Sequence, residues 1–204
     1  ARRLWEATEG AGTVVDVLIN NAGFGTQAPF VAIPWERSRE QLQLNVVSLT
    51  ELCWLFGGSM QSRGSGHILN VASTGAYQPV PHYATYSAGK AYVRNFSEAL
   101  AYDLAPTGVR VCCLCPGPTA TEFTEVAGHP ISSWERIFFM SAERCARIGL
   151  SSLFGWRRNV ISGYANKLQC FFMRLLPRRT QVWGAALVMA RPPPALAKRD
   201  GPSD

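Results

Sequence analysis

A tyrosine and a lysine four residues apart are the side chains of this sequence best suited to transferring a proton. They are Tyr86 and Lys90 in the stretch "YATYSAGKAY", and residues at this spacing share one face of a helix. A free tyrosine titrates near 10, so acid or base action at neutral pH requires that its phenolate be stabilised by about 4 kcal/mol. A neighbouring ammonium group supplies the positive charge for this. The pair therefore predicts a proton-transfer site, although the same spacing also arises by coincidence on a solvated helix.

Short apolar runs alternate with helical patterns and indicate the elements that would position this pair. Runs rich in β-branched residues predict strands at 14–20, 67–73, 109–115 and 159–163, and periodic apolar spacing predicts helices at about 34–64, 83–104 and 141–154. The buried face of the first helix is predicted to contain Leu42, Val46, Leu49, Cys53, Phe56 and Met60. Because the strands are apolar on both faces, we expect a parallel sheet covered on both sides, in one domain over residues 1–190. Residues 191–204 lack periodicity and are predicted to form a disordered tail.

Polar and glycine-rich segments follow the predicted strands, at the edge where an open parallel sheet binds its ligands. "NNAG" follows the first strand, Ser73 ends the second and "PGPTAT" follows the third. Ser73 is suited to orienting a carbonyl oxygen, but an ordinary turn serine is the alternative. Asn45 lies inside the long helix, where asparagine is mildly unfavourable and more often faces solvent. These positions converge with Tyr86 and Lys90 on one crevice.

The ordered set of motifs is more specific than any one of them. "LINNAG", "LNV" around Asn45, "NVAS", "YSAGK" and "CPGPTAT" occur in the order and spacing of the short-chain dehydrogenase/reductase family, which this chain resembles from about residue 14 to 125 and more weakly to 166. The resemblance implies an α/β fold, the C-terminal part of a doubly wound Rossmann-type parallel sheet. The first strands and the glycine-rich loop of that fold are absent from the sequence.

The resemblance also implies a role for each catalytic candidate. Tyr86 would protonate the oxygen of a carbonyl or deprotonate an alcohol, and Lys90 would lower the pKa of Tyr86 and bind the nicotinamide ribose. Ser73 would hold the substrate oxygen, and Asn45 would anchor a water that relays protons to Lys90. The implied reaction interconverts a small carbonyl compound and its alcohol.

The implied cofactor is NADP or NAD, which carries the hydride. Asn21, Ala22 and Gly23 would pass close to its ribose. The residues implied to line the nicotinamide are Pro116, Gly117, Thr119 and Thr121.

The family binds the cofactor's pyrophosphate on a glycine-rich turn about seventy residues before "NNAG", after its first strand. Here only nineteen residues precede Asn20, and Gly10 and Gly12 come before a strand instead of after one. We therefore expect a partial or truncated chain with impaired activity. The alternative is a catalytically silent interaction module, because the family's two long helices, here 36–60 and 83–104, commonly build dimers. The full-length form would be a homodimer or homotetramer.

The charge and the cysteine content indicate whether the chain binds nucleic acid, a metal or a membrane. The net charge is +6 and the pI is about 9.2, but no nucleic-acid-reading motif accompanies the basic residues. Cys112, Cys113 and Cys115 fall inside one apolar run, where they cannot easily bridge one another along a strand, and no cysteine has metal-like spacing to a histidine. The six cysteines therefore predict buried free thiols in the cytoplasm and no metal site. The segment "LQCFFMRLLPRR" and the following "VWGAALVMA" would either form a core or lid helix, which would indicate an apolar substrate, or lie on a membrane surface.

Overall fold

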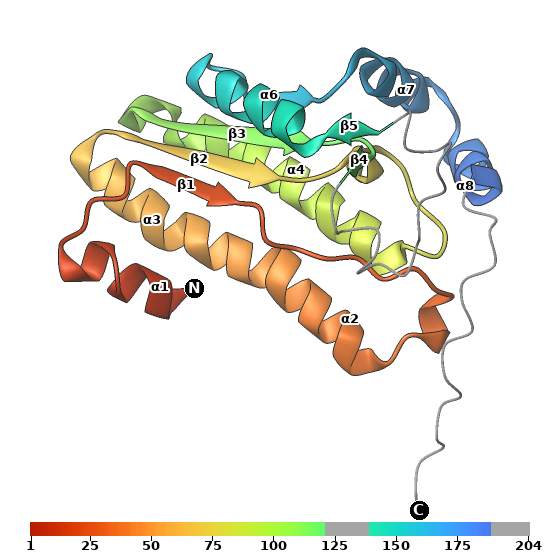
Figure 1. Cartoon of the computed structure of the whole chain (residues 1–204), viewed down its shortest axis with the longest axis horizontal. Coiled ribbons are helices and arrows are strands. Elements are labelled where there is room, and N and C mark those ends of the chain that lie inside the picture. Colours follow the sequence, from red (N-terminus) through yellow and green to blue (C-terminus); the bar gives the residue numbers. More distant parts are fainter. Residues whose placement is uncertain (121–138, 189–204) are drawn as a thin grey trace, which may run out of the picture.

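The computed structural model describes residues 1–120 and 139–188, and its centre is a four-stranded parallel sheet (Figure 1). The strands are β1 (Val17–Asn20), β2 (Gly66–Val71), β3 (Val109–Cys115) and β6 (Asn159–Ile161), in the order β1-β2-β3-β6. Leu18 pairs with Ile68 across β1 and β2, and Leu69 pairs with Cys112 across β2 and β3. The predicted parallel sheet is confirmed, and every predicted strand is present.

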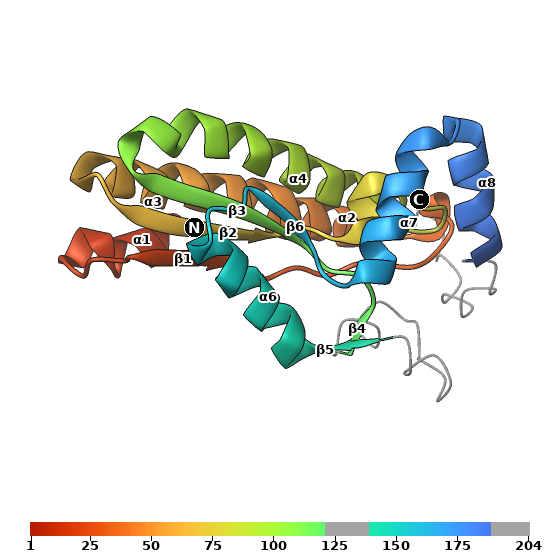
Figure 2. The same cartoon turned by 90° about the horizontal axis from the view of Figure 1, so that it is seen from above.

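One face of the sheet is covered by two long helical segments (Figure 2). The first comprises α2 (Trp35–Leu42), a π-helical turn η3 (Gln43–Ser48) and α3 (Leu49–Arg63), and the second is α4 (Ala84–Leu104). Gly64 ends α3 with a φ of 74°, a left-handed conformation that favours glycine. Phe56, Met60, Ile68 and Val93 are almost completely buried between these helices and the strands. This face holds the larger of the two hydrophobic clusters.

The opposite face is covered by α6 (Ala142–Phe154) alone among the described helices. Ser141 caps this helix by accepting a hydrogen bond from the Arg144 backbone N–H at 3.3 Å. The smaller cluster beneath α6 includes Leu114 and Leu153. It reaches the start of β1 at Val17 but leaves Ile19, on the same face, 48% exposed.

Residues 1–16 precede β1 and pack beside α3. They form α1 (Arg2–Glu6) and a 3-10 turn, η1 (Glu9–Ala11). The indole N–H of Trp5 donates to Ser59 Oγ at 3.1 Å, and Arg63 forms an ion pair with Glu9 at 2.9 Å. Gly10 and Gly12 lie in this segment, so they come before the strand, as the sequence predicts.

The C-terminal part extends the chain beyond the carboxyl ends of the strands. After β6 come α7 (Tyr164–Leu175) and α8 (Arg178–Val188), which lie together at the end toward which the strands point (Figure 1). A short parallel ladder of β4 (Thr119–Ala120) and β5 (Met140–Ser141) was not predicted. Shorter 3-10 turns are η2 (Phe30–Ala32), η4 (Thr74–Tyr77) and η5 (Ala105–Thr107). The predicted tail lies outside the described residues.

Two further observations concern the cysteines and the helices of the described residues. All six cysteines are buried and unpaired, as predicted. None of the helices in the described ranges is both long enough and apolar enough to cross a bilayer.

The buried face predicted for the first long helix is correct from Leu49 onward but wrong at its start. Leu42 is 37% exposed, whereas Ser38 and Gln41 are buried in the same helix. The π-helical turn η3 accommodates more residues per turn than an α-helix, so it rotates the residues before it out of phase with those after it. The regular spacing of three and four residues could not reveal this shift.

Candidate active site

Tyr86 and Lys90 lie in the first turns of α4, at the carboxyl end of β2. The Lys90 side chain is 6% exposed, and its Nζ donates a hydrogen bond to the carbonyl oxygen of Val71 at 2.7 Å. Its Nζ lies 5.8 Å from the centroid of the Tyr86 ring. The pair is therefore a buried lysine beside a partly buried tyrosine, with the lysine tied to the end of a strand.

Burial governs the protonation of both side chains. It lowers the pKa of Lys90 to about 8, with the Cys113 and Cys115 thiols acting in the opposite direction. It raises the pKa of Tyr86 to about 12, and a hydrogen bond with Ser73 opposes this rise. The expectation that Tyr86 has a pKa below its ordinary value is wrong for this structure, because desolvation outweighs the stabilisation of the phenolate. Tyr86 is thus protonated at neutral pH, the form that donates a proton.

Ser73 lies beside Tyr86, because it is placed between the end of β2 and the start of η4. It caps η4, and its Oγ accepts a hydrogen bond from the Gly75 backbone N–H at 3.1 Å. The side-chain hydrogen bond between Ser73 and Tyr86 brings the two hydroxyls together at one point. A carbonyl oxygen at this point would have two hydroxyl groups within reach.

Asn45 lies in the π-helical turn η3 and is 3% exposed. Its Nδ2 donates to the Phe24 carbonyl oxygen at 2.8 Å, and its Oδ1 accepts from the Phe24 N–H at 3.2 Å. The side chain thus fixes the loop that follows β1 instead of facing solvent. π-helical turns inside longer helices occur frequently at functional sites.

The backbone of Gly23 lies close to the side chains of both Asn45 and Lys90. A Cβ at Gly23 would lie 2.9 Å from Asn45 Oδ1 and 3.6 Å from Lys90 Nζ. Such a contact with Asn45 is closer than real Cβ atoms accept, so this close approach requires glycine. The three residues therefore form one cluster, which adjoins the Tyr86 and Ser73 hydroxyls through Lys90.

The other cofactor-binding candidates surround the same strand ends. Asn21 and Ala22 are exposed directly before Gly23. The Pro116 carbonyl oxygen accepts from the Thr74 N–H at 2.8 Å, which joins the ends of β2 and β3. Thr119 Oγ1 donates to the Gly117 carbonyl oxygen at 2.9 Å. Thr121 lies outside the described residues.

A buried amide network beneath the site was not predicted. Asn20 Nδ2 donates to Asn70 Oδ1 at 2.8 Å, and Asn70 Nδ2 donates to Ser97 Oγ at 2.9 Å. These bonds tie the ends of β1 and β2 to α4. The available signal was an asparagine inside each apolar strand run, "VLIN" and "HILNV", because a polar residue buried in a sheet requires a partner.

Asn166 on α7 was also missed. It packs so closely on Gly117 that a Cβ at this position would collide with the Asn166 side-chain amide. The contact brings α7 against the loop that follows β3.

The described residues fit the nicotinamide end of a dinucleotide. A lysine ammonium has three N–H donors, and Lys90 uses one on Val71, which leaves two for ribose hydroxyls. The backbone at Gly23 leaves no room for a side chain beside Lys90. By contrast, the described residues before β1 contain no glycine-rich turn from a strand into a helix, the element that binds a pyrophosphate.

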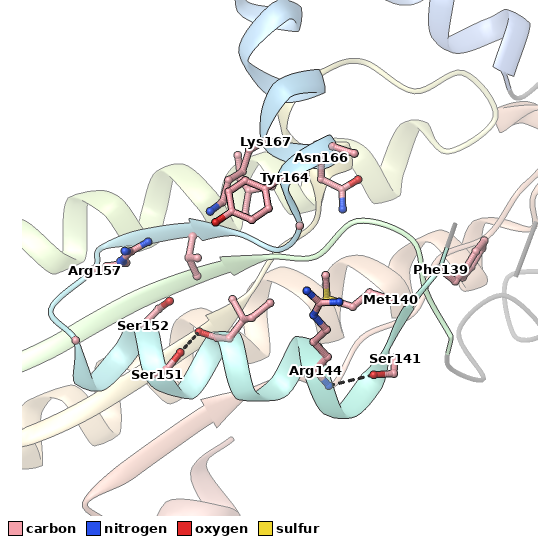
Figure 3. Close-up of a pocket in the computed structure, with 16 residues that line it drawn as sticks. Phe139, Met140, Ser141, Arg144, Ser151, Ser152, Arg157, Tyr164, Asn166 and Lys167 are labelled. Carbon is pink, nitrogen blue, oxygen red and sulfur yellow. Dashed lines mark hydrogen bonds between the residues drawn. The ribbon is translucent and has the colours of Figure 1, made fainter. Parts of the chain in front are cut away.

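A separate hollow of about 820 Å³ lies beside α6, β6 and the start of α7 (Figure 3). Arg144, Arg157 and Lys167 line it, together with apolar side chains, and no Asp or Glu does. Tyr86 and Lys90 do not contribute to it. The hollow is thus a cationic depression at the edge of the sheet, distinct from the cluster around Tyr86 and Lys90.

Comparison with known proteins places this geometry in a family. The sequence matches short chain dehydrogenases over residues 2–131, and the chain belongs to this family. It is 34% identical over 117 residues to an uncharacterized oxidoreductase of Myxococcus xanthus, covering 57% of this chain and 46% of the relative. It is 36% identical over 112 residues to an NADPH-dependent 3-dehydrocapnine reductase of Ornithobacterium rhinotracheale, covering 53% and 40%.

A solved structure agrees with these relatives. A short chain dehydrogenase from Burkholderia cenocepacia in complex with NADP superposes with a TM-score of 0.72 at 26% identity, covering 88% of this chain and 74% of that one. The chain spans less than half the length of the two curated relatives. The Rossmann-type fold is thus established.

Proposed function

We propose that this chain carries the catalytic residues of an NADP- or NAD-dependent oxidoreductase that interconverts a small carbonyl compound and its alcohol. The observation that carries the proposal is the cluster at the carboxyl ends of β1 and β2, in which Tyr86 contacts Ser73 and Lys90 lies beside Gly23 and Asn45. The names of two similar proteins, one NADPH-dependent and one in complex with NADP, support NADP as the cofactor.

Each side chain has a defined task in this reaction. The bound cofactor supplies the hydride. Ser73 orients the carbonyl oxygen by hydrogen bonding, and the Tyr86 hydroxyl donates the proton to that oxygen. Lys90 holds ribose hydroxyls with its remaining N–H groups, and Asn45 fixes the loop at Gly23 and anchors a water that relays protons to Lys90. Burial keeps Tyr86 protonated at neutral pH, so its hydroxyl can donate a proton to the carbonyl oxygen.

The substrate, assembly and location follow as further parts of the proposal. An apolar substrate is supported by the Phe, Leu and Met content of α7 and α8, if these helices act as a lid beyond the carboxyl ends of the strands. The assembly is a homodimer or homotetramer, and the location is the cytoplasm. Peripheral membrane contact through α7 and α8 is part of the same proposal.

The test begins with binding and continues with chemistry. NADPH and NADH are titrated into the purified chain while binding is followed by fluorescence, and NADPH consumption is then measured with a panel of apolar ketones. Tyr86→Phe is expected to lower the rate by about 100-fold to 10,000-fold and to leave NADPH binding within about twofold, because only the proton donor is lost. Tyr102→Phe, at an exposed tyrosine of the same helix, is the matched control. Ketone reduction that survives in Tyr86→Phe would overturn the assigned mechanism.

A second candidate function is a catalytically silent dimerisation module. Large side chains are exposed on the outer side of the paired helices, namely Trp54, Tyr92 and Tyr102 at 70%, 42% and 71%. The hydroxyls of Thr50 and Tyr92 lie 3.1 Å apart and join the two helices into one surface. A dimer that Trp54→Ser dissociates in light scattering, together with no saturable binding of either cofactor, would favour this function over catalysis.

A further inference from the structure

Helix α7 carries its apolar stripe on the side that faces away from the protein. Tyr164, Leu168, Phe171, Phe172 and Leu175 recur at steps of three and four residues, so they share one face. Their exposed fractions are 87%, 58%, 56%, 52% and 67%, in the same order.

The opposite side of α7 makes the contacts with the protein. There Cys170 is 3% exposed and belongs to the larger core cluster, and Asn166 packs on Gly117. An amphipathic helix of a globular protein normally directs its apolar stripe inward. The expectation that this segment is a core helix is therefore wrong, because its inward face is the more polar one.

Helix α8 extends the exposed surface and is held to α7. Gln181 Nε2 donates to the carbonyl oxygens of Met173 and Leu176, at 2.7 and 2.9 Å, which joins α8 to the end of α7. Gln181 and Ala185 are buried, while Trp183 and Leu187 are 66% and 58% exposed. The two helices thus form one unit with large apolar side chains on its outer side.

The charge on this unit has one sign. Residues 164–188 contain Lys167, Arg174, Arg178 and Arg179 and no Asp or Glu. None of the ion pairs found within residues 1–120 and 139–188 involves any of these four cations. The cationic hollow beside the start of α7 adds Arg144 and Arg157 nearby (Figure 3).

We propose that the outer side of α7 and α8 is a docking surface for an anionic lipid bilayer. Apolar side chains bordered by cations that form no ion pair are the composition of a helix that lies in the plane of a membrane interface. Its rings lie among the acyl chains and its cations lie at the lipid phosphates. Because α7 and α8 lie beyond the carboxyl ends of the strands, this surface directs the active-site end of the sheet toward the bilayer (Figure 1).

Charge favours a bilayer over a second copy of the chain. Two copies meeting through this surface would bring Arg174, Arg178 and Arg179 of one chain against the same cations of the other. Like charges brought together in a partly desolvated contact are destabilising, whereas anionic headgroups neutralise them. The inference does not rest on the proposed reductase activity, since its measurement is lipid binding.

Vesicle flotation of the full chain tests the proposal, because aggregates sink and only lipid-bound protein rises. The vesicles are phosphatidylcholine alone, or phosphatidylcholine with about one phosphatidylglycerol in four lipids. We expect binding to the anionic vesicles that weakens as salt is raised. The double variant Phe171→Ser with Phe172→Ser should bind at least about tenfold more weakly. The triple variant Arg174→Gln, Arg178→Gln and Arg179→Gln should lose roughly 100-fold at low salt.

Matched variants at the other end of the sheet give the control. Phe154 and Tyr102 are 50% and 71% exposed, and Phe154→Ser with Tyr102→Ser should leave flotation unchanged. Arg2, Arg3 and Arg158 are exposed arginines away from α7, and their change to Gln removes the same charge. Circular dichroism checks that each variant folds.

Two results would overturn the proposal. In the first, the full chain floats with the vesicles, and the α7 and α8 variants reduce this flotation no more than the control variants do. The other is an absence of flotation together with a dimer that the Phe171 and Phe172 changes dissociate, which would assign the surface to a second copy.

Discussion

The two faces of the sheet differ in what covers them, and β1 shows the difference within one strand. Leu18 points toward α3 and is 7% exposed, whereas its neighbour Ile19 points to the other face and is 48% exposed. The face under α3 and α4 also holds Lys90, Asn45 and the amide network. Stability and chemistry therefore depend on the same side of the sheet, and four predictions compare the two sides.

The largest effect is expected at Phe56, which is 2% exposed in the middle of the covered face. Phe56→Ala should lower the free energy of unfolding by about 3–5 kcal/mol, because it removes buried apolar surface and leaves a cavity. Urea unfolding followed by circular dichroism gives the value. A loss below about 1 kcal/mol would mean that this face is not the main core.

Lys90 should give the covered face a distinctive dependence on pH. Its pKa is about 8 in the folded chain and 10.5 as the ordinary value, so between these limits the Lys90 side chain binds more protons in the unfolded chain. The contribution of Lys90 to stability therefore rises with pH in that window. The gain is about 3 kcal/mol from pH 8 to 10.5. Lys90→Met should lack this gain, which is measured as the difference between the two unfolding curves at each pH. Equal slopes in both proteins would contradict the burial of a charged lysine.

A smaller loss is expected at Asn70, whose side chain bonds both Asn20 and Ser97. Asn70→Ala should cost about 1–3 kcal/mol, because two buried polar groups lose their partner. The matched double variant with Asn20→Ala should cost less than the sum of the two single changes, since both act on one network. Additive losses would show that the bonds act independently.

The smallest effect is expected on the open face. Ile19→Thr should change the free energy of unfolding by no more than about 0.5 kcal/mol, because half of the side chain is already in water. Leu18→Thr, one residue away, is the matched control and should cost well over 1 kcal/mol. Equal costs at the two positions would remove the distinction between the faces.

Local sequence patterns were sufficient to predict most of the fold. The runs at 109–115 and 84–104 were recognised almost residue by residue, because apolar periodicity, glycine and proline mark their ends. The convergence of Tyr86, Lys90, Ser73 and Asn45 was also predictable, since parallel strands bring their carboxyl ends to one edge.

Features that depend on tertiary contacts could not be predicted from local sequence patterns. The raised pKa of Tyr86 arises from burial, which no local pattern reports. The mixture of large apolar residues and arginine in α7 did not say which face of the helix turns inward. Asn166 meets Gly117 only because α7 folds back on the loop after β3.

The π-helical turn at residues 43–48 has a consequence for insertions and deletions. Such a turn is equivalent to one residue inserted into an α-helix. Deleting one residue there would restore a continuous helix, return Leu42 to the face of Leu49 and lengthen the regular hydrogen-bond ladder. It would also rotate Asn45 away from Phe24 and open the loop at Gly23. The shorter chain would have a higher free energy of unfolding but would bind the proposed cofactor more weakly. The extra residue therefore lowers the stability of the helix and places the Asn45 amide against the loop.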